Sequence, residues 1–125
     1  VSKEASDEAI RRTLGQMLFD EQAQHNKIRA LSGGEAARLV FGSLMLKEHN
    51  VLILDEPTNH LDMESTEALI EALKDYSGTL IMVSHNRYFI SETANRIVEL
   101  HGEKVIDFLG GYAEFVEKHE RDYLD

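Results

Sequence analysis

The stretch VLILDEPTNHLD, residues 51–62, places two adjacent acids directly after a short apolar run. An apolar run of this length is typical of a strand that is buried on both faces of a parallel sheet. A second such run, TLIMVS at residues 79–84, follows a stretch with helical spacing. Strands that alternate with helices indicate an α/β fold built in layers around a parallel sheet.

Asp62 is placed to cap the helix between these two runs, which we expect over residues 63–76. Further along, the sequence predicts a short helix through Phe89 and Ile90 and a hairpin with the turn HGE at its tip. A last helix is expected over residues 112–123, after a Gly-Gly pair. The apolar positions expected to face inward on the first of these helices are Ala68, Leu69, Ala72 and Leu73.

The segment before residue 51 reads as helical. Leu14, Met17 and Leu18 have the spacing of one helix face, and that helix is expected to end at residues 19–21, before a loop. Ser32 followed three residues later by Glu35 forms a capping box, which predicts a helix from Ser32 to Glu48. Its buried face is expected to hold Ala37, Val40, Phe41, Leu44 and Met45.

Composition excludes several classes of protein. The 125 residues contain no cysteine and carry a formal net charge of −10, so neither a disulfide framework nor an overall basic nucleic-acid surface is expected. No apolar run approaches the roughly 20 residues of a membrane span, and no secretion signal is visible. We therefore expect a cytoplasmic protein without a membrane partner. Because the chain starts with Val1, we also expect it to be part of a longer protein.

Asp55 and Glu56 lie where a parallel sheet binds ligands, beyond the carboxyl end of a strand. One carboxylate there can hold Mg²⁺, which prefers oxygen ligands and keeps several waters. The next carboxylate can orient an attacking water for phosphoryl transfer. On the dipeptide alone, two acids that merely cap the following helix explain the pattern as well.

His85 follows the second apolar run, thirty residues after Asp55 (85 minus 55). Successive parallel strands end at the same edge of a sheet, so the sequence predicts that this imidazole and the Asp55 carboxylate meet there. A histidine in this place could donate a hydrogen bond to a terminal phosphate. Taken alone, it could equally be an ordinary surface histidine.

The LSGGE stretch, residues 31–35, opens a predicted helix with two glycines. A helix N-terminus offers free N–H groups and a partial positive charge, which together attract anions. The capping box accounts for Ser32 and Glu35 without any ligand. It does not account for Gly33 and Gly34, since each glycine costs about 0.8–1 kcal/mol relative to alanine inside a helix. Close approach of a ligand to the backbone would explain them.

Taken together, these motifs resemble those of a known family. LSGGE resembles the signature motif of ABC ATPases, VLILDE their Walker B strand, PTNHLD their D-loop and VSHNR their histidine switch. The run DEPTNHLD resembles the ABC-F class, which comprises soluble tandem-domain ATPases associated with ribosomes. The resemblance covers roughly residues 8–125, and DMESTEAL resembles the second ABC domain of such proteins.

The resemblance implies a role for each motif residue. It makes Asp55 the metal-associated acid, Glu56 the general base or water-orienting group, and His85 the sensor of the γ-phosphate. Asn86 stands where the family usually has aspartate, which removes a charge beside that histidine. The implied nucleotide-binding residues are Ser32, Gly33, Gly34, Glu35 and Asp62, the last of them at the seam between two domains.

The resemblance also implies a fold and partners. The fold would be part of a P-loop NTPase domain, with residues 1–50 in the helical signature subdomain and residues 51–125 in the ATPase core. The cofactors would be ATP and Mg²⁺. The partners would be a second ABC domain, in the same chain or a dimer mate, and the ribosome or its RNA.

One element of such an ATPase is missing from this sequence. None of the eight glycines begins the phosphate loop G-x-x-x-x-G-K-[ST], so we expect this chain to be inactive alone. Two other interpretations stay open. One is the nucleotide-binding subunit of a membrane transporter, against which Asn59 and His60 argue. The other is a stand-alone interaction module that keeps the motifs without the activity.

Overall fold

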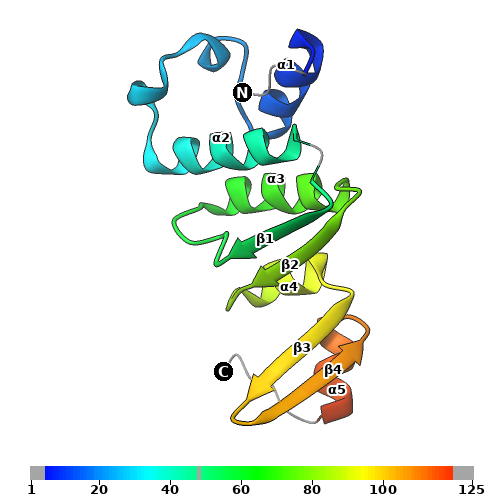
Figure 1. Ribbon diagram of the computed structural model, residues 1–125. Helices are drawn as coiled ribbons and strands as arrows, with labels where there is room; N and C mark the ends of the chain where they lie inside the picture. The colour runs from blue at the N-terminus through cyan, green and yellow to red at the C-terminus, as the bar shows by residue number, and fades with distance from the viewer. Residues whose placement is uncertain (1–4, 48, 120–125) are drawn as a thin grey trace. The chain divides into compact units, whose positions relative to one another are not determined.

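The computed structural model describes residues 5–47 and 49–119. The chain divides into two compact units, one up to Val83 and one from Ser84 onward. The first unit contains α1 (Asp7–Gln16), α2 (Gly33–Met45), β1 (Val51–Asp55), α3 (Met63–Lys74) and β2 (Thr79–Val83) (Figure 1). Two short 3-10 turns, Ala23–His25 and Ile28–Ala30, lie between α1 and α2.

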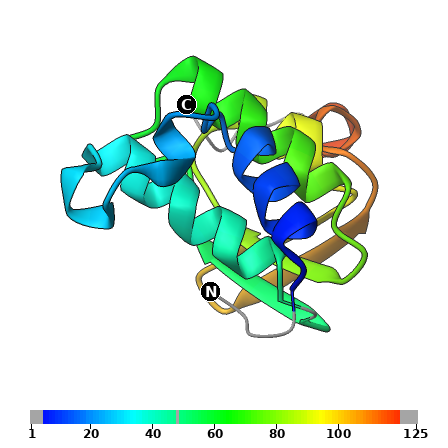
Figure 2. The same ribbon diagram turned by 90° about the horizontal axis from the view of Figure 1, so that it is seen from above.

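The two strands of the first unit form a parallel sheet. Their register runs from Val51 opposite Thr79 to Asp55 opposite Val83. Figures 1 and 2 show α1, α2 and α3 grouped on one side of these strands. This arrangement confirms the α/β fold with a parallel sheet.

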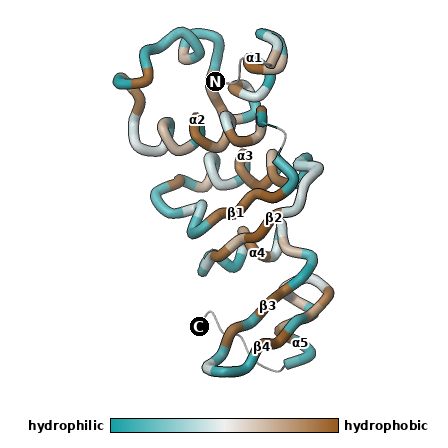
Figure 3. The backbone as a smooth tube through the Cα atoms, viewed as in Figure 1, coloured by the Kyte–Doolittle hydropathy of each residue, from teal (hydrophilic) through white to brown (hydrophobic). Residues whose placement is uncertain are grey.

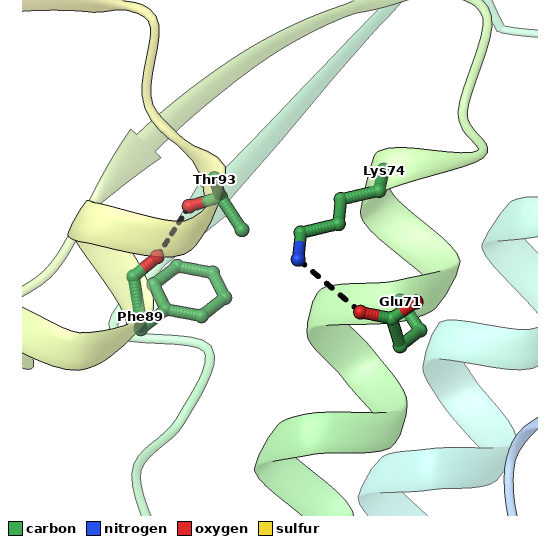
Figure 4. Close-up of polar contacts among 4 residues, drawn as sticks. All are labelled: Glu71, Lys74, Phe89 and Thr93. Atoms are coloured by element: carbon green, nitrogen blue, oxygen red, sulfur yellow. Dashed lines mark hydrogen bonds and ion pairs between the residues drawn. The ribbon is translucent and has the colours of Figure 1, made fainter. Parts of the chain in front are cut away.

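The first unit buries apolar side chains of β1 and α3, and a further core cluster joins α3 to α1, α2 and the segment between them, through Met17, Phe19 and Ala72. Leu52 and Leu54 of β1 are buried, as are Leu69, Ile70 and Leu73 of α3. Both predicted helices on either side of β1 are confirmed: α2 begins after Ser32 and α3 after Asp62. On the exposed surface of α3, Lys74 forms an ion pair of 3.2 Å with Glu71 (Figure 4).

The opposite face of β1 departs from the prediction. Val51 is 50% exposed and Ile53 is 69% exposed, although both belong to the apolar run. Figure 3 shows the apolar character of β1 and β2. Because side chains alternate along a strand, burial of Leu52 and Leu54 directs their neighbours to the other face. The expectation of a strand buried on both faces is therefore wrong for the residues that the structure describes.

The end of α1 also differs from the prediction. The helix stops at Gln16, and Leu18 adopts a left-handed φ of 64°. The N–H of Phe19 donates to the carbonyl of Leu14 at 2.9 Å and that of Leu18 to Gly15 at 3.1 Å, the two bonds of a Schellman cap. This turn buries Phe19 and leaves Leu18 37% exposed, so Leu18 is not part of the buried face.

The second unit contains α4 (Arg87–Thr93), the antiparallel hairpin of β3 (Arg96–His101) and β4 (Lys104–Leu109), and α5 (Tyr112–His119). The hairpin and both helices were predicted, and the part of the last helix beyond residue 119 lies outside the described residues. Within α4, the hydroxyl of Thr93 donates to the carbonyl of Phe89 at 2.6 Å (Figure 4). No described helix is both long enough and apolar enough to cross a membrane.

Candidate functional site

The LSGGE turn forms the start of α2. Ser32 Oγ accepts a hydrogen bond from the N–H of Glu35 at 3.3 Å, and Glu35 Oε2 accepts one from the N–H of Ser32 at 2.7 Å. This confirms the capping box. A Cβ added to Gly33 would meet no atom within 4 Å. Packing within the described chain therefore gives no reason for a glycine at this position, and the backbone of the first turn is open to a ligand.

The loop after β1 has an unusual backbone. Glu56 has a left-handed φ of 45°, and its N–H donates to the carbonyl of Val83 in β2 at 2.7 Å. Four residues further on, His60 has a φ of 66°. Non-glycine residues in this region cost free energy and persist where the surrounding structure enforces them, as happens at functional sites. Asp55 is the last residue of β1 and is exposed beside this loop.

The LSGGE turn and the loop after β1 lie next to each other. A Cβ added to Gly34 would lie 3.9 Å from the carbonyl oxygen of His60. Two residues after His60, Asp62 Oδ1 accepts a hydrogen bond from the N–H of Ser65 at 2.8 Å and so caps α3. Two motifs separated in the sequence are thus brought together within the first unit.

Hydrogen bonds lower the pKa of two carboxyl groups in this region. The pKa of Glu35 lies below its ordinary value, chiefly because the backbone N–H of Ser32 donates to the carboxylate. The pKa of Asp62 is lowered as well, chiefly by its hydrogen bond with the side chain of Ser65. Both groups are therefore ionised at neutral pH, as their capping roles require.

His85 belongs to the second unit, two residues after the end of β2. Its meeting with Asp55 stays a prediction. The next residue, Asn86, caps α4, because its Oδ1 accepts from the N–H of Phe89 at 3.0 Å. Asparagine and aspartate are about equally good N-caps, so the departure from aspartate leaves this helix start intact.

Among the described residues, no group of three or more His, Cys, Asp or Glu side chains could hold a metal ion. Asp55 can still offer one exposed carboxylate. A single protein carboxylate suits Mg²⁺, which keeps several waters and takes its other ligands from substrate phosphates. The residues present therefore fit a magnesium ion that arrives with a nucleotide.

Sequence reasoning missed one residue of this region, Arg38 in α2. Its Nη1 donates to Ser65 Oγ at 2.9 Å, across 27 positions of sequence. The available signal was a single arginine one turn after Glu35 on a helix with an otherwise largely apolar sequence. A polar cleft elsewhere in the first unit, between α1 and the C-terminal end of α3, is lined by none of the predicted site residues.

The chain is similar to a family of known proteins. Residues 2–59 match the ABC transporter family model. The chain is 51% identical to "Probable ATP-binding protein YbiT" of Escherichia coli O157:H7, over 91% of this chain and 22% of that protein. It is 49% identical to "Putative ATP-binding protein YdiF" of Bacillus subtilis, over 90% of this chain and 17% of the relative. It is 46% identical to "ABC transporter F family member 2" of Arabidopsis thaliana, over 88% of this chain and 16% of that protein.

Proposed function

Because the chain belongs to the ABC family of ATP-binding proteins, we propose that it forms the segment from the signature motif to the histidine switch of an ABC-F type ATPase. The chain spans 22% or less of the relatives described above, so the activity proposed is that of a larger protein. The observation that carries the proposal is the open backbone of Gly33 at a helix start that lies against the loop after β1.

The first part of the proposed mechanism concerns binding. The N–H groups of Gly33 and Gly34 and the hydroxyl of Ser32 would bind the γ-phosphate of a nucleotide held by another ABC domain. The partial positive charge at the start of the 13-residue α2 favours this anion. ATP would thereby draw two ABC domains together, with Asp62 near the seam, and hydrolysis would release them.

The second part concerns hydrolysis. Asp55 would hold Mg²⁺, which when bound supplies charge stabilisation for phosphoryl transfer. Glu56 would orient the attacking water and accept its proton, and its left-handed backbone turns the chain sharply just after the Asp55 position. His85 would donate to the γ-phosphate and so report its presence. These assignments agree with catalysis that consists mostly of positioning and charge stabilisation.

The first experiment replaces Glu56 by Gln in the full-length protein. We expect ATP turnover to fall by about 10²–10⁴-fold, the usual contribution of a general acid–base group, while ATP binding is retained. Steady-state turnover and equilibrium nucleotide binding measure the two effects. Unchanged turnover would remove Glu56 from its role. The isolated chain, assayed in parallel, should show negligible turnover because it has no phosphate loop.

A second experiment tests the partner. The resemblance of DEPTNHLD to the ABC-F class supports the ribosome or its RNA as the partner, and translation in the cytoplasm as the setting. With a net charge of −10, this chain is a poor surface for RNA, so those contacts would come from other parts of the protein. The full-length Glu56→Gln variant should sediment with ribosomes in ATP and not in ADP. Equal sedimentation in both nucleotides would contradict the proposal.

A further inference from the structure

Arg38 connects three parts of the first unit. Its guanidinium donates from Nη1 to Ser65 Oγ at 2.9 Å, and Ser65, near the start of α3, is only 2% exposed. The same group lies over the ring of Phe19, 5.5 Å from its centroid, and Phe19 is 4% exposed. One side chain of α2 thus contacts both α3 and the segment that follows α1.

The position of Arg38 relates it to both helix caps near the candidate site. Ser65 donates its N–H to the capping carboxylate of Asp62 at 2.8 Å while its hydroxyl accepts from Arg38. Glu35, whose carboxylate completes the other cap, lies three residues before Arg38 on the same helix. Hydrogen bonds with Ser32 and Ser65 are the main causes of the lowered pKa of the two carboxyl groups, and the positive charge of Arg38 adds a smaller effect. Arg38 therefore ties α2, the helix that Ser32 and Glu35 cap, to the residue that Asp62 caps in α3.

A purely structural role explains this arginine poorly. Its Nε is buried and has no hydrogen-bond partner among the residues that the structure describes. A buried donor without a partner is costly, and a well-packed apolar side chain would avoid that cost. What arginine supplies instead is a rigid planar fork, which fixes direction as well as distance.

We infer that Arg38 is a positioning residue that holds the LSGGE turn in register with the Asp62-capped start of α3. This inference rests on the proposed function, in which both motifs face the nucleotide of another ABC domain. Arg38 itself does not touch the nucleotide. Because Arg38 joins the two motifs, both would contact the γ-phosphate as one rigid surface. We therefore expect Arg38 to affect the ATP-dependent association of the two domains more than the hydrolysis step.

The kinetic test uses the full-length protein with Arg38→Met, Ser65→Ala and the double variant. Arg38→Met should raise KM for ATP about tenfold, the scale of one lost hydrogen bond to a charged group, and change kcat much less. Ser65→Ala should produce much of the same rise, and the double variant should add little to Arg38→Met. Arg38→Lys should not restore KM, because it keeps the charge without the fork.

The matched control is Arg11→Met, which removes the same charge from an exposed position in α1. If Arg38 were only structural, its loss would lower the fraction of active protein and hence kcat, with KM unchanged, and that result would overturn the inference. Should Arg38→Met fail to fold, Ser65→Ala still removes the acceptor alone, and an unchanged KM in that variant would also overturn the inference.

Hydrogen exchange separates this inference from the proposed function. In the absence of nucleotide, Arg38→Met or Ser65→Ala should speed exchange of the amides that the two caps hold, those of Glu35 and Ala36 and of Ser65 and Thr66, whereas Arg11→Met should not. If amide exchange were faster in these variants but the wild-type protein had no ATP turnover, the proposed function would be rejected and the role of Arg38 in coupling the two helix starts would be retained. Unchanged exchange at the start of α2 in both variants would reject the coupling itself.

Discussion

At Gly33, a role in ligand binding can be tested separately from a role in folding. A methyl group added there would enter open space, and alanine suits a helix better than glycine. We therefore expect Gly33→Ala to leave the free energy of unfolding unchanged or slightly higher. In the full-length protein it should lower ATP turnover at least about tenfold, because the methyl would occupy the space through which the phosphate approaches the backbone. Thermal unfolding and turnover measure the two effects.

The control for that experiment is a glycine with the opposite surroundings. At Gly78, just before β2, an added Cβ would lie 2.8 Å from the carbonyl oxygen of His49 and 2.7 Å from the ring of Tyr76. Overpacking of this kind costs about 1–3 kcal/mol, so Gly78→Ala should destabilise the fold. A Gly33→Ala variant that unfolds as readily as Gly78→Ala would show that Gly33 serves packing rather than binding.

At the scale of elements, the starts of α2 and α3 predict a dependence of stability on pH. The ordinary pKa values of Glu35 and Asp62 are 4.5 and 3.8, and both are lowered in the folded protein. Their stabilising contributions are therefore fully present above the ordinary values and are lost as the pH falls through the lowered, folded-state values. The free energy of unfolding should thus decrease on acidification below about pH 4.5.

Denaturant unfolding between pH 7 and pH 3 measures this effect. Glu35→Gln and Asp62→Asn remove the titrating groups and keep side chains of similar size, so each variant should lose part of the pH dependence. Asp7, an exposed acid in the first turn of α1, provides the control as Asp7→Asn. If the free energy of unfolding fell as steeply with decreasing pH in the Glu35→Gln, Asp62→Asn double variant as in the wild type, these caps would not be the cause of the loss of stability in acid.

The elements themselves were largely predictable because their signals are local. A capping box, a capping aspartate and an apolar run each specify structure within a few residues, and α2, α3, β1 and β2 formed where those signals lie. The exposed faces were less predictable. Val40 of α2 was expected inside and is 56% exposed, because helical spacing defines a face only approximately and neighbouring elements decide which part of it is covered.

The candidate site shows the same division between local and distant information. The sequence predicted Ser32, Glu35 and Asp62 as helix caps, and the structure confirms those hydrogen bonds. It gave no sign of the contact between Arg38 and Ser65, since nothing in a single sequence reports which of many polar residues meet across 27 positions. The left-handed conformations of Glu56 and His60 were hidden as well, because glutamate rarely adopts them and histidine, although enriched there, adopts them at only a minority of positions.

At the scale of the whole molecule, the uncovered face of the β1–β2 sheet predicts association. Ile53 is 69% exposed and Ile81 is 51% exposed, and the register places them opposite each other. The described residues form only these two strands of the sheet, and apolar surface beside the open edges of such a sheet tends to pair with other chains. The chain studied alone should therefore self-associate as its concentration rises, as light scattering would detect.

The variant that tests this prediction is Ile53→Lys with Ile81→Lys, which should keep the isolated chain monomeric to higher concentration. The control is Glu64→Lys with Glu71→Lys, at two exposed positions on α3. These two substitutions change the net charge more than the two isoleucine substitutions do, and they leave the apolar face of the sheet unaltered. A wild-type chain that stays a clean monomer at high concentration would contradict the prediction. Association removed equally by the control pair would assign the effect to net charge.

The left-handed backbone at Glu56 changes how a saturation screen at that codon should be interpreted. A φ of 45° is hard for β-branched side chains and easier for glycine, asparagine or aspartate. Valine and isoleucine would score badly for two superimposed reasons, the missing carboxylate and the twisted main chain. Only the difference in activity between glutamate and glutamine reports the role of the proton acceptor. Differences in activity among the apolar substitutions instead report how strongly the fold requires the left-handed backbone at this position.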